Sequence, residues 1–201
     1  MRIVLATTNR HKLQEARSVL SGLGIEIASL DEFPSIEPPV EDAATFEGNA
    51  RIKALYYAGI LGCWALADDS GLEVDALDGA PGVLSARFAG EGADDRANNA
   101  KLIAALANVP DARRTARYRC SVAFAGGERI IATAAGTLEG VILAAPRGSN
   151  GFGYDPYFWI PARAMTAAEM TTDQKNSISH RGTAFRAIRE KIEFAAADGE
   201  I

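Results

Sequence analysis

Two adjacent aspartates, Asp68 and Asp69, follow a short apolar run and precede Ser70-Gly71. Carboxylate oxygens bind hard cations such as Mg²⁺, and a carboxylate can also take a proton from an attacking water. We interpret residues 63–67 as a strand and the Asp-Asp-Ser-Gly segment as the turn that ends it. Ligands bind at the carboxyl ends of strands in α/β sheets, so this turn is a candidate active site. Two neighbouring carboxylates repel each other, which favours a bound metal. The alternative is a turn whose polar side chains only cap a helix.

A polar segment at residues 7–12 separates an apolar run at 3–6 from a helical pattern at 13–20. Free backbone N–H groups at the start of a helix can bind phosphate, and Lys12 adds a positive charge. The segment lacks the glycines and the Lys-Ser/Thr pair of a Walker A loop. A capped helix start without a ligand is the alternative.

Glu41, Asn49 and Lys53 form another polar group. Asn49 and Lys53 are four residues apart, so they share one face of a predicted helix, and Glu41 lies just upstream in an acidic, Pro-rich loop. A solvated face with Glu-Lys pairing is the alternative to a functional role.

Two segments near the C-terminus complete the candidate site. Residues 148–156 contain three glycines and two aromatic side chains, a composition that lets backbone lie against a flat ring and an aromatic side chain stack on it. Lys175 and the segment Ser179-His180-Arg181-Gly182 supply donors for carbonyl or phosphate oxygens. A plain turn and a helix N-cap at Ser179 are the alternatives. The two histidines of the chain argue against a zinc site, and no Gly-x-Ser-x-Gly segment supports a serine nucleophile.

These segments need a scaffold of strands and helices. Strands and helices alternate at first and a hairpin follows, so we predict an α/β fold with a mixed central sheet flanked by helices. We expect residues 1–201 to form a single domain of two lobes with a central substrate cleft. The expected strands are 3–6, 25–27, 63–67, 116–125, 128–138, 140–143 and 158–161. The expected helices are 13–20 (ended by Gly22 and Gly24), 45–59 with Thr45 as N-cap, 94–107 and 180–197, with a loop at 34–42, a hairpin turn at Gly126-Gly127 and a capping box at Thr166 and Glu169.

Composition restricts the function classes. The 201 residues are 48% hydrophobic and 23% charged, which is typical of a globular protein. The net charge of −5 argues against binding to a nucleic-acid polymer but allows a local basic pocket for a small polyphosphate. No apolar run reaches the roughly 18–20 residues that span a bilayer, and the N-terminus lacks a signal-peptide pattern. Cys63 and Cys120 lie in apolar stretches, so we expect both to be buried free thiols in a reducing compartment. We therefore expect a cytoplasmic protein without a membrane partner.

Taken in order, the polar segments closely resemble those of the inosine/xanthosine triphosphate pyrophosphatase family, which acts on non-standard purine nucleotides. The resemblance covers nearly the whole chain. It rests on Ala6-Thr7-Thr8-Asn9-x-x-Lys12, Thr45-Phe46-x-x-Asn49-Ala50-x-x-Lys53-Ala54, Ala67-Asp68-Asp69-Ser70-Gly71-Leu72, Gly79-Ala80-Pro81-Gly82, Ser85-Ala86-Arg87, Gly151-Phe152-Gly153-Tyr154-Asp155-Pro156 and Ser179-His180-Arg181-Gly182. The resemblance implies a homodimer that requires Mg²⁺ and hydrolyses ITP, dITP and XTP to the monophosphate and pyrophosphate. Such an enzyme removes deaminated purines from the nucleotide pool.

The chemistry of that reaction suggests a role for each residue. We expect Asp69 to be the general base, Asp68 to support it or to be a second metal ligand, and Lys53 to assist catalysis. Glu41 and Asp69 are the expected Mg²⁺ ligands. We expect residues 7–12 and Lys53 to hold the phosphates, and donors around Phe152 to read the 6-oxo group of the base. The expected substrate-binding residues are Thr7, Thr8, Asn9, Arg10, His11, Lys12, Ser70, Phe152, Gly153, Tyr154, Asp155, Lys175, His180 and Arg181.

Two other functions compete with this one. The first is a Maf-like nucleotide pyrophosphatase, which prefers other bases; the segments at 152–155 and 179–181 argue against it. The second is a nucleotide sensor that binds without catalysis and has no need of Asp68 and Asp69. The presence of both aspartates disfavours a sensor.

Overall fold

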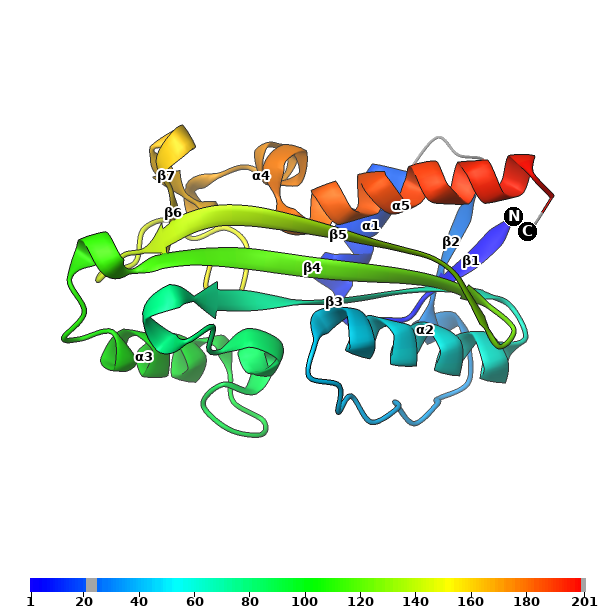
Figure 1. Ribbon diagram of the computed structural model, residues 1–201, viewed down its shortest axis with the longest axis horizontal. Helices are drawn as coiled ribbons and strands as arrows, with labels where there is room; N and C mark the ends of the chain where they lie inside the picture. The colour runs from blue at the N-terminus through cyan, green and yellow to red at the C-terminus, as the bar shows by residue number, and fades with distance from the viewer. Residues whose placement is uncertain (21–24, 200–201) are drawn as a thin grey trace. The chain divides into compact units, whose positions relative to one another are not determined.

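The computed structural model describes residues 1–20 and 25–199, without the side chain of His11. Within this part of the chain, the strands form one seven-stranded sheet in the order β2-β1-β3-β4-β5-β6-β7 (Figure 1). β1 pairs in parallel with β2 and β3, whereas β6 pairs antiparallel with β5 and β7. The predicted mixed sheet of an α/β fold is confirmed. The strands are β1 (Arg2–Leu5), β2 (Glu26–Ser29), β3 (Trp64–Val74), β4 (Thr115–Gly126), β5 (Arg129–Ile142), β6 (Phe158–Ile160) and β7 (Met165–Thr166).

The α-helices of the described chain are α1 (Arg10–Leu20), α2 (Phe46–Leu61), α3 (Asp95–Ala105), α4 (Thr172–Ile178) and α5 (His180–Ala197). The Thr45 hydroxyl accepts a hydrogen bond from the backbone of Gly48, which confirms the predicted N-cap of α2. The capping box at Thr166 and Glu169 is also present. The predicted helix end at Gly22 and Gly24 lies outside the described residues. No described helix is long and apolar enough to cross a membrane.

The contacts divide the chain into two compact units. Unit 1 comprises Met1–Asp69, Cys120–Gly136 and His180–Ile201, and unit 2 comprises Ser70–Arg119 and Thr137–Ser179. The chain passes from one unit to the other within β3, β4 and β5 and again at the start of α5. The expected cleft between two lobes stays a prediction.

Unit 1 has helices on both faces of its strands. α1 and α5 cover one face and α2 covers the other (Figure 1). Because successive side chains of a strand point to opposite faces, each strand contributes to two cores. The core under α1 and α5 contains Ile3, Leu5, Leu66, Cys120, Val122 and Phe124 from the strands. The core under α2 contains Ala6, Ala65, Ala67, Ala123 and Ala125.

Unit 2 has its own core. Leu102 and Leu106, at the C-terminal end of α3, pack there with residues from the unit's strands and from the loop before β6. The tyrosine of that loop, Tyr154, is buried in this core, and so is Tyr118 of β4. This packing anchors the loop at residues 151–155 to the unit.

Two predicted elements differ from the structure, and one helix was not predicted. β3 does not end at residue 67 but continues to Val74, so the predicted Asp-Asp-Ser-Gly turn is wrong. Leu72 and Val74 are fully buried and continue the alternation, and the charged side chains before them meet cations within the protein. The separate strand predicted at 140–143 is the end of β5. Helix α4 was not predicted, although Thr171 and Gln174 form a capping box at its start.

Candidate active site

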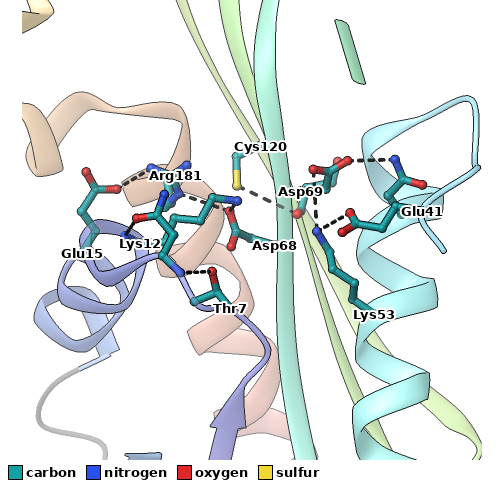
Figure 2. A network of polar contacts seen from close by, with 12 residues as sticks. Thr7, Lys12, Glu15, Glu41, Lys53, Asp68, Asp69, Cys120 and Arg181 are labelled. Atoms are coloured by element: carbon teal, nitrogen blue, oxygen red, sulfur yellow. Dashed lines mark hydrogen bonds and ion pairs between the residues drawn. The ribbon is translucent and has the colours of Figure 1, made fainter. Parts of the chain in front are cut away.

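Asp68 and Asp69 lie on opposite faces of β3. Leu66, two residues before Asp68, belongs to the core under α1 and α5, whereas Ala67, two residues before Asp69, belongs to the core under α2. Figure 2 shows the same division, with Asp68 directed to one side of the strand and Asp69 to the other. The two carboxylates therefore make their direct contacts with separate sets of partners, Asp68 with Lys12 and Arg181 and Asp69 with Lys53 and Asn49.

Asp68 lies in a buried cluster of four charges. Its Oδ2 atom is 2.9 Å from Lys12 Nζ and 3.2 Å from Arg181 Nε. Arg181 Nη1 is in turn 2.5 Å from Glu15 Oε2 (Figure 2). The Asp68 side chain is fully buried and that of Arg181 is 3% exposed. Two cations and two anions thus compensate one another away from water.

The cluster shifts the pKa values of Asp68 and Arg181. Burial alone would raise the pKa of Asp68, but the positive charges of Lys12, Arg181 and Lys53 outweigh it and lower that pKa below its ordinary value. Burial would lower the pKa of Arg181, and the charges of Asp68 and Glu15 raise it instead. Asp68 and Arg181 are therefore both charged at neutral pH.

Local structure brings these side chains together. Lys12 and Glu15 are three residues apart in α1, so they share a helix face. The loop before α1 is ordered by its own polar groups, because Asn9 N–H donates to Thr7 Oγ1 and Lys12 N–H donates to Asn9 Oδ1. Arg181 is the second residue of α5, which packs against α1. The loop and the two helices thus converge on the Asp68 face.

Asp69 has a different environment. Its Oδ1 is 3.8 Å from Lys53 Nζ, and its Oδ2 accepts a hydrogen bond from Asn49 Nδ2 at 3.1 Å. Lys53 Nζ also contacts Glu41 Oε2 at 2.6 Å (Figure 2). The helical spacing of Asn49 and Lys53 does place both on one face, and that face meets Asp69. The Asn49 carboxamide is oriented by Ala43 N–H, which donates to its oxygen.

The pKa of Asp69 is raised, because burial outweighs the stabilising charge of Lys53 and the hydrogen bond from Asn49. Burial would lower the pKa of Lys53, but the charges of Asp69 and Asp68 raise it, so the ammonium stays protonated. A carboxylate with a raised pKa beside a fixed cation can take a proton from a water and keep the charge of the site balanced.

The donor set at Asp69 suits Mg²⁺. No three His, Cys, Asp or Glu side chains gather as a metal site in the described chain. However, Mg²⁺ often binds to one or two carboxylates together with substrate phosphates and water. Glu41 and Asp69 both approach Lys53 Nζ, so the two carboxylates converge on the position of the Lys53 ammonium. Asp68, on the other face, contacts Lys12 and Arg181 instead, and its role as a second metal ligand stays a prediction.

Unit 2 contains the second group of predicted residues. Asp155 is buried, and its Oδ2 accepts from Lys175 Nζ at 2.6 Å and from Phe152 N–H at 2.9 Å. Its Oδ1 accepts from the Tyr118 hydroxyl at 3.2 Å. Lys175 Nζ also lies 4.9 Å from the centre of the Phe152 ring. Lys175 and Phe152, which are far apart in sequence, therefore form one aromatic and cationic pair.

The remaining predicted residues are placed as follows. Tyr154 is buried, and its hydroxyl donates to the carbonyl oxygen of Ser85, so its side chain serves the protein interior. Thr8 and Arg10 are exposed, Ser70 is half-buried and His180 is buried. The side chain of the remaining predicted residue, His11, lies outside what is described. The predicted residues divide between the two units. Those in unit 1 are Thr7, Thr8, Asn9, Arg10, Lys12, Glu41, Lys53, Asp68, Asp69, His180 and Arg181, and those in unit 2 are Ser70, Phe152, Gly153, Tyr154, Asp155 and Lys175.

Sequence reasoning missed several residues that hold this site. Glu15 was overlooked, although its helical spacing from Lys12 is a usable signal. Tyr118 lies in the middle of a strand, and nothing in the sequence marks it as a partner of Asp155. Asp95 and Asn99 of α3 contact the backbone of Gly153, more than fifty residues away in sequence. Only the tertiary structure makes those pairs visible.

Comparison with known proteins gives a consistent result. A sequence model of the Ham1 family matches residues 3–191. A dITP/XTP pyrophosphatase from Desulforamulus reducens is 53% identical over 190 residues, covering 94% of each chain. One from Geobacter sulfurreducens is 50% identical over 193 residues, covering 95% of this chain and 96% of the relative. The solved structure of a HAM1 protein from Coxiella burnetii, 41% identical, superposes with a TM-score of 0.89 over 97% of this chain and all of the other. With its sheet, its charged clusters and these near-complete matches, the chain belongs to the Ham1 family.

Proposed function

We propose that this protein hydrolyses the non-standard purine nucleoside triphosphates ITP, dITP and XTP to the monophosphate and pyrophosphate. The observation that carries the proposal is Asp69, a carboxylate of raised pKa held against Lys53, Asn49 and Glu41. The high identity to curated dITP/XTP pyrophosphatases supports the choice of substrate. Such an activity removes deaminated purines from the nucleotide pool.

We also propose that the enzyme uses Mg²⁺, held by Glu41 and Asp69. When bound, the ion neutralises phosphate charge and lowers the pKa of a coordinated water. Lys53 contacts both carboxylates. If these held Mg²⁺, the Lys53 ammonium would exchange them for a phosphate oxygen. Asn49 keeps Asp69 oriented through this exchange, because its carboxamide is itself held by the backbone of Ala43.

In the reaction, Asp69 takes a proton from the water that attacks the α-phosphorus. The P–O bond between the α-phosphorus and the bridging oxygen breaks, and pyrophosphate leaves with the electron pair of that bond. Lys12 and the ordered backbone before α1 bind the phosphates, since Lys12 is the member of the Asp68 cluster with the most exposed side chain, at 17%. Lys12 can exchange Asp68 for a phosphate oxygen while Arg181 keeps its bonds to Asp68 and Glu15.

The aromatic and cationic pair of unit 2, Phe152 and Lys175, recognises the base. Phe152 stacks on the purine ring, and Lys175 presents a donor to the acceptor oxygen at position 6. Adenine carries an amino donor at position 6, so a site built from donors leaves buried groups unpaired against ATP. A homodimer in the cytoplasm completes the proposal.

The test is pyrophosphate release from ITP, XTP, dITP, GTP and ATP, with Mg²⁺ and with EDTA. We expect fast release from ITP, dITP and XTP that EDTA abolishes, with little from ATP or GTP. Asp69→Asn should lower turnover by about 10²–10⁴-fold with an unchanged fold. Glu47→Gln, which changes an exposed carboxylate on α2, is the control and should keep full activity.

Other outcomes contradict the proposal in different ways. Release from standard or pyrimidine nucleotides indicates a Maf-like enzyme. Tight nucleotide binding without any release indicates a sensor. Near-normal turnover by Asp69→Asn refutes its role as general base.

A further inference from the structure

The loop that carries Phe152 is bound to helix α3 through both backbone polar groups of Gly153. Gly153 N–H donates to Asp95 Oδ2 at 2.6 Å, and Gly153 C=O accepts from Asn99 Nδ2 at 2.8 Å. Asp95 and Asn99 are four residues apart on α3, so one helix face holds both polar atoms of this glycine. Phe152, the adjacent residue, is thereby tied to a rigid element.

Gly153 needs such a restraint. Its φ of +62° lies in the left-handed region, and a glycine has more backbone conformations available than any other residue. A Cβ at this position would meet no atom within 4 Å, so packing of the residue itself does not fix it. The two hydrogen bonds to α3 are therefore its restraint on this side of the loop. The opposite side is held separately, because Asp155 accepts from Phe152 N–H.

Asn99 is built for this contact. Its side chain is buried, and Nδ2 donates both to Gly153 C=O and to the backbone carbonyl of Asp95 at 2.8 Å. Oδ1 has no hydrogen-bond partner among the described residues. The hydrogen bonds that anchor this side chain are therefore both donated by Nδ2.

Its neighbour Asn98 has a different task. Asn98 Oδ1 accepts from Ala89 N–H at 2.8 Å, and its Nδ2 donates to Ala86 C=O at 3.1 Å. It is equally buried and on the same helix, but it fastens the segment at 86–89 and does not contact Gly153. The two asparagines therefore make a matched pair.

We propose that Asn99 is a positioning residue for base recognition, which acts with Asp95 through Gly153 to hold Phe152 in its stacking orientation. The inference rests on the proposed function, in which Phe152 stacks on the purine. Loss of the Asn99 contact frees the loop and misaligns the ring. The groups that act on the phosphates are elsewhere in the chain, so base binding weakens while the chemical step is retained.

The experiment compares Asn99→Leu with Asn98→Leu by backbone amide exchange and by kinetics with dITP. We expect Asn99→Leu to raise the amide exchange rate at residues 152–154 roughly tenfold. It should also raise KM for dITP roughly tenfold and leave kcat within about twofold of the native value. Asn98→Leu should speed exchange at residues 86–89 instead and leave KM for dITP within about twofold of the native value. Unchanged exchange or unchanged KM in Asn99→Leu overturns the proposal, and so does an equal rise of KM in both variants.

A second pair covers the case in which the leucine variants fail to fold. Asp95 and Asp94 are both exposed at the start of α3, but only Asp95 contacts Gly153, whereas Asp94 caps the helix. Asp95→Ala should raise KM for dITP several-fold more than Asp94→Ala, and the reverse order refutes the inference. A native protein that releases no pyrophosphate refutes the proposed function instead, while the exchange comparison still decides whether Asn99 holds the loop.

Discussion

Replacing Asp68 by asparagine tests the buried charge cluster directly. The substitution keeps the shape of the side chain and removes one negative charge from a group that contains Lys12, Arg181 and Glu15. The cluster then carries one uncompensated positive charge. Lys12 can turn toward water because its side chain is partly exposed, but Arg181 cannot, since its side chain is 3% exposed and it loses the charge of one of two carboxylates that it contacts.

The size of the effect follows from this geometry. Breaking a buried ion pair by removal of one partner costs about 3–5 kcal/mol. The asparagine oxygen still accepts one hydrogen bond and Lys12 can relax, so we expect the lower end, about 3 kcal/mol. For a protein of this length, that corresponds to a decrease in Tm of roughly 6–12 °C.

The dependence on pH has a definite sign. The pKa of Asp68 is lowered by folding, so its charge stabilises the protein above the ordinary value of 3.8 and loses this effect as pH falls through the folded-state pKa. The stability difference between native protein and Asp68→Asn should therefore be constant at neutral and mildly acidic pH and shrink only below 3.8.

Urea unfolding at several pH values measures this difference. Glu139→Gln is the control, because Glu139 pairs with Arg117 at an exposed position where such pairs contribute about 0–1 kcal/mol. The reasoning is refuted if Asp68→Asn costs no more than Glu139→Gln, or if the difference already falls between neutral and mildly acidic pH.

Two further predictions concern the catalytic base and the glycines of the sheet. Lys53→Met removes a charge that lowers the pKa of Asp69, so the acid limb of the kcat/KM profile should move to higher pH; a limb that stays in place or moves lower contradicts the assignment of the base. Gly136→Ala should destabilise by about 3 kcal/mol, because a Cβ there would overlap backbone atoms in the first turn of α5, which cannot move independently. Gly126→Ala should cost less, about 1 kcal/mol, since its Cβ would meet side-chain atoms of Trp64 and not backbone; thermal unfolding of both variants decides the order.

The sequence predicted elements well where local signals were strong. The apolar run of β1 and the N-cap at Thr45 depend on neighbouring residues in the chain, so the sequence alone is sufficient to predict them. The continuation of β3 past residue 67 could not be predicted in this way. Two aspartates within a strand are stable only where cations from other elements neutralise them. Asp68 and Asp69, at which the predicted strand ended, instead pair with cations that are distant in sequence.

The candidate site divides in the same way. The spacing of Asn49 and Lys53 was sufficient to place both on one face, and the structure brings that face to Asp69. Sequence could not show that Arg181 is enclosed by Asp68 and Glu15, because its partners come from two other elements. It also could not show that Asp155 serves Lys175 and Tyr118, which depends on how a loop, a helix and a strand meet.

The alternation of β3 also limits how this protein can change during evolution. A single-residue insertion or deletion between Trp64 and Asp68 would move each carboxylate to the opposite face of β3, away from its own partners. Such an indel would damage both environments in one event, whereas a point substitution damages one of them. We therefore expect this short stretch of strand to tolerate substitutions of its alanines far better than any change in its length.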